Sequence, residues 1–242
     1  MRQLRKITDL KGYNFKARDG DIGTLKGCYF DDNSWLVRYL VVRTGSWLLG
    51  RDVLLVPSVI LGVDQERKLI DVDLTCKQIE SCPPVNTKLP VSRHYENEYY
   101  KYYGWEPYWV GELFFESPPH AAQRIEAKPP EKPQNPHLRS SDEVIGYQIE
   151  AQNGEPGHVA GLILDDEDWR IRYLIMDTKS WLPGKKVLIS TPWAKTVIWA
   201  EQKIQLDVTC EQIESAPDYD PSKTISRDEE IRLYKHYGKT LE

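Results

Sequence analysis

The sequence predicts an all-β protein made of two tandem small β-barrels, each followed by short helices. Two observations predict this fold. A shift of 134 positions, from Gly12 to Gly146, aligns residues 12–104 with 146–238 without a gap, and about 35 of the aligned pairs are identical. Each copy also contains short runs of alternating apolar and polar residues between polar, glycine-containing turns. A long repeat that occurs twice indicates two self-sufficient domains.

The strands follow from a two-residue period and from the turns between them. The runs that read as strands in the first copy are 14–17, 24–30, 35–43, 52–57, 59–64 and 69–72. In the strand that begins at Trp35, alternate residues including Val37 and Tyr39 form an apolar face, which we expect to face the core. The opposite face carries Arg38, or Arg172 in the second copy, among apolar residues. This mixed face predicts partial cover, by a helix or by the other domain.

Short helices are predicted after the strands of each copy. Thr75 with Gln78, and Thr209 with Gln212, have the spacing of a capping box, and a proline follows each segment. A second helix is expected from Ser92 in the first copy and from Ser226 in the second. The first of these carries tyrosines at 95, 99, 102 and 103, a stripe at helical spacing that predicts packing on its own domain.

These elements divide the chain into three parts. Residues 1–104 form the first repeat with its helices, 105–138 an aromatic segment and a proline-rich linker, and 139–242 the second repeat with its helices. The aromatic segment, Trp105–Phe115, is expected to fold back over a barrel or to bridge the two. The alternative is an exposed patch for a partner or a membrane surface.

Composition excludes several classes of protein. A net charge of −5 gives no basic excess for a dedicated nucleic-acid binder, so no nucleic-acid partner is expected. No run approaches the roughly 20 apolar residues of a membrane span, which leaves only peripheral membrane association. Four cysteines are too few for a disulfide scaffold of this size. The expected location is the bacterial cytoplasm.

Several motifs resemble the PRC-barrel family. They are Gly-Tyr, Gly-x-x-Gly, Asp-Asp, Trp-x-x-Arg-Tyr-Leu and Trp-Leu-x-Gly-x-x-Val-Leu, and they recur over residues 10–83 and 144–217. The family includes the cytoplasmic domain of the photosynthetic reaction-centre H subunit. The resemblance implies small β-barrels without catalysis of their own, used as adaptors on larger assemblies. It carries over no residue role, because the membrane helix of the H subunit has no counterpart in this sequence.

Six residues are candidates for an interaction surface, because Arg and Trp are enriched at binding hot spots: Arg38, Trp47, Trp105, Trp109, Arg172 and Trp181. The two arginines have a structural alternative, a salt bridge to a nearby carboxylate such as Asp73 or Asp207. The loop tryptophans Trp47 and Trp181 either cap the barrel end or dock a partner.

No catalytic, cofactor or metal site is predicted. The five histidines are scattered, and no phosphate-binding or dinucleotide-binding glycine motif is present. The acidic turns at Asp31 and Asp165 are typical of tight turns, with a hard-cation site as the weaker alternative. Cys76 and Cys210 open short helices, where a thiol pKa can be lowered, but a small buried residue is the commoner role.

We therefore expect a non-catalytic protein-interaction or adaptor module with an unidentified protein partner. Its two barrels are expected to pair within the chain, and a homo-oligomer is an open alternative. The alternative function is an auxiliary cytoplasmic factor of a membrane electron-transfer complex resembling that of the H subunit.

Overall fold

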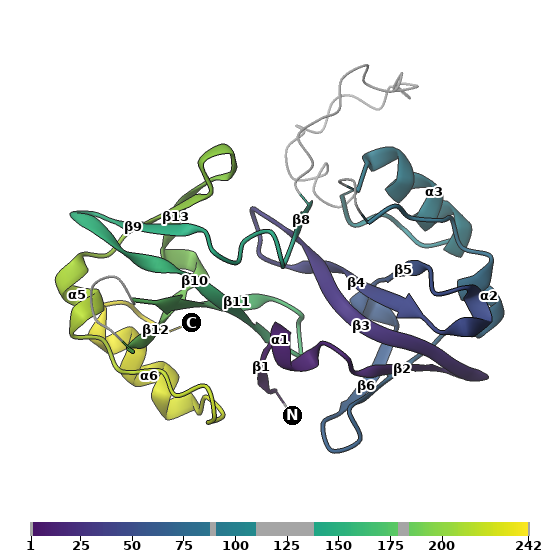
Figure 1. Cartoon of the computed structure of the whole chain (residues 1–242), viewed down its shortest axis with the longest axis horizontal. Coiled ribbons are helices and arrows are strands. Elements are labelled where there is room, and N and C mark those ends of the chain that lie inside the picture. Colours follow the sequence, from purple (N-terminus) through teal and green to yellow (C-terminus); the bar gives the residue numbers. More distant parts are fainter. Residues whose placement is uncertain (1, 88–90, 110–137, 179–183, 242) are drawn as a thin grey trace, which may run out of the picture.

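A computed structural model describes residues 2–87, 91–109, 138–178 and 184–241, which form two β-rich units side by side (Figure 1). Each unit contains a seven-stranded sheet. The first sheet consists of β2 (Asn14–Ala17), β3 (Gly20–Asp31), β4 (Val37–Thr44), β5 (Asp52–Leu55), β6 (Ile60–Asp64), β7 (Leu69–Val72) and β8 (Leu138–Ser140). The second consists of β1 (Leu4–Lys6), β9 (Gln148–Ala151), β10 (Gly154–Asp165), β11 (Ile171–Asp177), β12 (Lys186–Ser190), β13 (Ala194–Ile198) and β14 (Lys203–Leu206).

The two sheets have the same strand order. The first runs β5-β4-β3-β2-β7-β6 and the second β12-β11-β10-β9-β14-β13, so the largely β fold is as predicted. In the part of the chain that the structure describes, neither order closes into a ring. A 3₁₀ turn at Pro57–Val59 separates β5 from β6, and one at Thr191–Trp193 separates β12 from β13. Each turn contains a proline at its start, where the fixed φ of proline suits a helical first turn.

The units exchange a short strand. β1 pairs antiparallel with β10 of the second unit, and β8 pairs antiparallel with β3 of the first. The two registers correspond under the repeat shift, since Leu4 lies opposite Asp165 and Leu138 lies opposite Asp31. In Figure 1 both strands lie between the units. Residues 4–6 therefore belong to the second sheet, although their place in the chain is within the first repeat.

A second reciprocal contact joins the turns that precede β4 and β11. The Ile171 amide donates to the Trp35 carbonyl, and the Val37 amide donates to the Trp169 carbonyl, each at 2.8 Å. Both tryptophans have a left-handed backbone, with φ of 59° and 58°. A bulky residue rarely adopts this conformation, and each carbonyl is held there by the other unit. Trp35 therefore lies before β4 and not within it, and its ring is buried in the core as expected, where it stacks on Phe30 at 5.3 Å.

Helices cover one side of each sheet (Figure 1). The short helices are α1 (Ile7–Leu10), α2 (Cys76–Glu80) and α5 (Cys210–Glu214), and the longer ones are α3 (Arg93–Tyr103) and α6 (Arg227–His236). The predicted capping boxes are formed at Thr75 and Thr209, and the helix that starts after Ser226 has one as well. Tyr39 on β4 meets Tyr99 on α3 edge to face at 5.5 Å. Both faces of β4 are thus covered, because Leu40 and Val42 on the other face are also buried.

Candidate functional site

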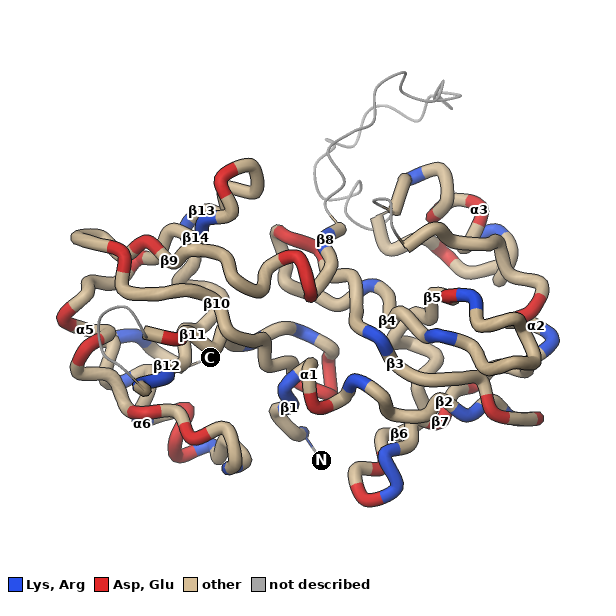
Figure 2. The backbone as a smooth tube through the Cα atoms, in the orientation of Figure 1, with Lys and Arg blue, Asp and Glu red and all other residues tan. Residues whose placement is uncertain are grey.

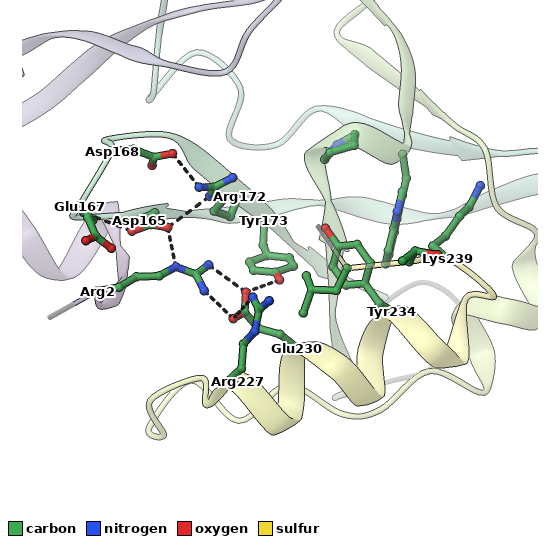
Figure 3. A pocket seen from close by; sticks show the side chains of 14 residues that line it. Arg2, Asp165, Glu167, Asp168, Arg172, Tyr173, Arg227, Glu230, Tyr234 and Lys239 are labelled. Carbon is green, nitrogen blue, oxygen red and sulfur yellow. Dashed lines mark hydrogen bonds and ion pairs between the residues drawn. The ribbon is translucent and has the colours of Figure 1, made fainter.

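A depression of about 700 Å³ lies in the second unit between β11, the 3₁₀ turn at Thr191–Trp193, α6 and residues 239–241 (Figure 3). Residues of both charge signs line it. Over both units, acidic and basic residues are interspersed along the chain (Figure 2). The charged residues at its wall are Arg2, Asp165, Glu167, Asp168, Arg172, Arg227, Glu230 and Lys239. Three aromatic residues, Tyr173, Trp193 and Tyr234, complete the wall. We call this depression the second-unit pocket.

The floor of the pocket is a carboxylate held by three donors. The Glu230 side chain is almost fully buried on α6, and its Oε1 accepts the Tyr173 hydroxyl at 2.7 Å. Arg2 donates to both carboxylate oxygens, at 2.9 and 3.1 Å. Burial, followed by the hydrogen bond to Glu230, raises the pKa of Tyr173 well above its ordinary value, so this hydroxyl is a donor at neutral pH.

A second buried carboxylate extends this network. Asp165 accepts from Arg2 Nε at 2.6 Å and lies 3.3 Å from Arg172 Nε. Arg172 also donates to Asp168 at 2.6 Å, and more than a third of its side chain stays exposed. Burial lowers the pKa of Arg2, but its bonds to Glu230 and Asp165 outweigh this and raise it, so the guanidinium stays charged. Arg2 therefore bridges both carboxylates, and part of the Arg172 side chain remains exposed to solvent.

The opposite wall is aromatic. The Tyr234 hydroxyl lies 2.6 Å from the Ser190 hydroxyl, which fixes the ring beside Trp193 at a centroid distance of 5.1 Å. Trp193 in turn packs on Tyr237 at 4.5 Å. The pocket thus has aromatic residues on one side, with Tyr234 among them, and charged residues on the other (Figure 3).

The first unit contains the same site in a filled form. Glu96, the counterpart of Glu230, is buried and accepts the Tyr39 hydroxyl at 2.9 Å. The Tyr108 hydroxyl donates to the same Oε1 at 3.0 Å, and the Tyr108 ring lies 3.9 Å from Arg38 Cζ. Tyr108 therefore occupies the position between arginine and glutamate in the first unit.

Trp109 continues this packing. Its ring meets Tyr100 edge to face at 5.3 Å, and Arg93 Cζ lies 4.1 Å from the ring centroid. Tyr108 and Trp109 thus contact four residues, namely Arg38, Arg93, Glu96 and Tyr100. Under the repeat shift these correspond to Arg172, Arg227, Glu230 and Tyr234, and all four line the second-unit pocket.

The structure places the predicted interaction residues at three locations. Arg38, Trp105 and Trp109 lie in or beside the filled site of the first unit, where Trp105 stacks on Tyr103 at 4.3 Å. Arg172 lines the second-unit pocket. Trp47 lies apart, in a 3₁₀ turn at Ser46–Leu48, where its Nε1 donates to the Ile22 carbonyl at 2.8 Å and 38% of the residue is exposed.

Trp181, predicted to cap the barrel end or dock a partner, lies outside the described residues. The aromatic segment does fold back over its own unit as far as Trp109, and its remaining residues, 110–115, also lie outside the described part of the chain.

The arginines form salt bridges, but not with the carboxylates suggested by the sequence. Arg38 lies 3.7 Å from Asp31, and Arg172 contacts Asp165 and Asp168. Asp73 instead pairs with Arg18, and Asp207 with Lys195 and Lys239. The reason is geometric: Asp31 ends β3 directly beside β4, whereas Asp73 follows β7 on the far side of β2.

Several residues of the site were missed in the sequence. Glu96 and Glu230 are identical residues at equivalent positions of the two repeats. The recurrence of a carboxylate in both second helices could have identified them as candidates. Arg2 and Tyr108 lie outside the aligned repeat region, so the repeat could not have pointed to them.

The acidic turns and the helix-opening cysteines have structural roles. Asp31 Oδ1 accepts the amides of Asn33 and Ser34 at 3.1 and 2.9 Å, an arrangement that closes a tight turn. Burial raises the pKa of the Cys76 and Cys210 thiols, so the helix start does not activate them. Within the described ranges, no three His, Cys, Asp or Glu side chains are grouped to hold a metal ion.

No protein-family model matches this chain, and a search of curated proteins finds no similar sequence. Among the helices that the structure describes, none is long and apolar enough to cross a membrane.

Proposed function

We propose that this chain is a non-catalytic protein-interaction module of the PRC-barrel type and that it binds a partner protein through the second-unit pocket. The motif resemblance in both repeats supports the family, and the shared strand order of the two sheets is consistent with a repeated β unit. The resemblance implies that the chain acts as an adaptor. The second-unit pocket would be the surface through which it binds its partner.

One observation carries the proposal: the equivalent site in the first unit holds a piece of polypeptide. Residues Tyr108 and Trp109 fill it, with ring contacts to two arginines and a hydroxyl bond to a buried glutamate. The same residue types line the open pocket of the second unit. A constellation that binds a segment of its own chain has the chemistry to bind a segment of another.

The chemistry of the pocket also favours recognition over reaction. The Glu230 carboxylate is held in place by hydrogen bonds from Tyr173 and Arg2. The exposed groups are an arginine and aromatic rings, the residue types that dominate binding hot spots.

Affinity capture with matched variants tests this function. The native chain and the Arg172→Glu variant are used as baits in lysate of the source cells. The control bait is Arg67→Glu, because the Arg67 side chain is 80% exposed and the residue is far in sequence from those that line the pocket. We expect one protein to be retained by the native and control baits and lost by Arg172→Glu. Equal retention by all three baits, or retention by none, would contradict the proposal.

A second function, an auxiliary factor of a membrane electron-transfer complex, is favoured by the loop after β4. Leu49 is 96% exposed and Trp47 38% exposed at the tip of this loop, and an exposed Trp–Leu pair suits an interface with lipid or a membrane complex. Cosedimentation with anionic vesicles tests it. The native chain would be expected to bind, and the Trp47→Ala/Leu49→Ala variant would lose most of this binding. Equal sedimentation of both would remove the support for this second function.

A further inference from the structure

The strand β6, which ends the first sheet on one side, has an open edge. One of its edges pairs antiparallel with β7, and the strand order of the sheet ends there. Among the residues that the structure describes, no strand pairs with its other edge. The hairpin of β6 and β7 projects from the unit at the bottom of the view in Figure 1. An open edge presents unpaired N–H and C=O groups that can pair with another extended chain.

The equivalent strand of the second unit, β13, has a lysine where β6 has a leucine. Both strands end their sheets, and both have a register shift at the same point, around Leu61 in β6 and Lys195 in β13. A lysine on an edge strand disfavours pairing with another chain. Leu61 instead is 66% exposed, and the space around the next residue, Gly62, is open to 4 Å in the described part of the chain. The edge of β6 is therefore more accessible to another backbone than that of β13.

A second difference lies between the outer strand and the exchanged strand of each unit. Trp199 follows β13, and the centroid of its ring lies 4.2 Å from Arg139 Cζ on the exchanged strand β8. The equivalent residue of the first unit is Gln65, whose Oε1 accepts from Arg5 Nη1 on β1 at 3.2 Å. An indole therefore covers the arginine in the second unit, whereas a smaller amide contacts it in the first.

A groove of about 660 Å³ lies beside β6 in the first unit. It is lined by residues 60–63 of β6, by Gln3 and Arg5, and by the acidic turn 166–168. Residues 60–63 are Ile, Leu, Gly and Val, so this stretch of the edge carries no charge. An apolar strand edge and a set of carboxylates thus meet in one groove.

The carboxylates of this turn give the groove a preference for a cation. The turn 165–168 contains four acidic residues, whereas the equivalent turn 31–34 contains two. Arg5 pairs with Asp166, and Arg172 pairs with Asp168. Glu167 is exposed, and within the described ranges its carboxylate makes no hydrogen bond or ion pair. A basic side chain in the groove would therefore find an acidic partner at Glu167.

We propose that the open edge of β6 binds an extended segment of a partner protein as an added β-strand, and that this segment alternates apolar and basic residues. Main-chain hydrogen bonds to β6 supply affinity, and alternate side chains contact Leu61 and the acidic turn. The acidic groove and the net charge of −5 favour a basic partner over a second copy of this chain. This surface differs from the second-unit pocket, with which it shares only Glu167 and Asp168.

Fluorescence anisotropy of a labelled peptide, Val-Lys-Val-Lys-Val-Lys, on the full chain in about 0.15 M salt tests the proposal. We expect the native chain to bind this peptide and to bind two control peptides at least about tenfold more weakly. The first control has glutamate in place of lysine, which reverses the charge. The second has proline in place of valine, which keeps the charge and removes backbone donors.

Two variants copy the second unit into the groove. Leu61→Lys introduces the residue found in β13, and it is expected to weaken binding at least about tenfold, because it removes an apolar contact and repels the basic peptide. Gln65→Trp introduces the counterpart of Trp199 and is expected to weaken binding by covering Arg5. The matched control is Ile231→Lys, which makes the same charge change at a residue of α6 that is 49% exposed and outside the groove. It is expected to leave binding unchanged.

Circular dichroism shows whether each variant keeps its fold, and Gln65→Trp serves as the test if Leu61→Lys does not. The proposal is overturned if the lysine peptide does not bind the native chain, or if neither groove variant weakens its binding. Equal binding of the proline peptide would show a contact of charge alone and would also overturn it. If sedimentation shows a dimer that Leu61→Lys dissociates, a second copy occupies the edge and the assignment to a partner protein is wrong. Because Leu61 does not line the second-unit pocket, these results are independent of the capture experiment.

Discussion

Replacing Tyr108 with phenylalanine removes one hydroxyl and leaves the ring on Arg38 in place. That hydroxyl donates to the buried Glu96 carboxylate at 3.0 Å. A hydrogen bond to a charged group contributes about 1.5–3 kcal/mol, and Glu96 keeps its bonds to Tyr39 and Arg93, so the lower end of the range applies. We therefore predict that Tyr108→Phe lowers the free energy of unfolding by about 1.5 kcal/mol.

Urea unfolding followed by tryptophan fluorescence measures this change, and a double-mutant cycle with Glu96→Gln isolates the pair. The control is Tyr102→Phe, because the Tyr102 hydroxyl donates to the neutral main-chain carbonyl of Gln78 in α2 at 2.8 Å in an exposed position. A loss of only about 0.5 kcal/mol is expected. A Tyr108→Phe loss no larger than that of the control, together with zero coupling to Glu96, would refute the docking of Tyr108 on this carboxylate.

Three other predictions concern the fold. Gly23→Ala is expected to lower the free energy of unfolding by more than about 3 kcal/mol, because the added Cβ would lie 1.9 Å from the Arg43 carbonyl oxygen on the adjacent strand. Gly12→Ala, at a residue with φ of 83° and open space around it, is expected to cost only about 1 kcal/mol. Thermal unfolding of both variants measures the difference. Burial raises the pKa of Glu96, although nearby cations and hydroxyls oppose this. The folded state then binds more protons than the unfolded state, so stability falls as pH rises above the ordinary carboxyl pKa of about 4.3. Between pH 4 and pH 8 the melting temperature of Glu96→Gln should therefore fall less than that of the native chain. Parallel curves for the two proteins would contradict the prediction. Arg5→Ala removes the largely buried ion pair between Arg5 on β1 and Asp166 after β10, whose atoms lie 2.7 Å apart. The free energy of unfolding in urea is expected to fall by about 2 kcal/mol. An unchanged value would argue against the exchanged strand.

The local structure was largely readable from the sequence. The repeat shift, the turn residues and the capping boxes identified most strands and the helix starts, because these signals depend on a few neighbouring residues. Whether the sheet closes was not readable, because closure depends on how the first and last strands of each sheet lie in space, and neither strand order closes into a ring in the described residues. The exchanged strands were also missed, since a three-residue strand has no period and its partner lies in the other repeat.

The candidate site was readable only in part. Arg38 and Arg172 were identified by their recurrence, but their partners depend on which strands are neighbours, and the sequence suggested carboxylates on the wrong strand. The left-handed backbone of Trp35 and Trp169 is imposed by contacts between the units, so no local pattern indicates it. Arg2 completes the pocket from far away in the chain, and only the folded arrangement brings it to Glu230.

The central claim is that the second-unit pocket is a protein-binding site. Affinity capture from lysate of the source cells with the native chain, Arg172→Glu and Arg67→Glu as baits tests it most directly. We predict one protein that the native and Arg67→Glu baits retain and the Arg172→Glu bait loses. Equal retention by all three baits, or retention by none, would contradict the claim.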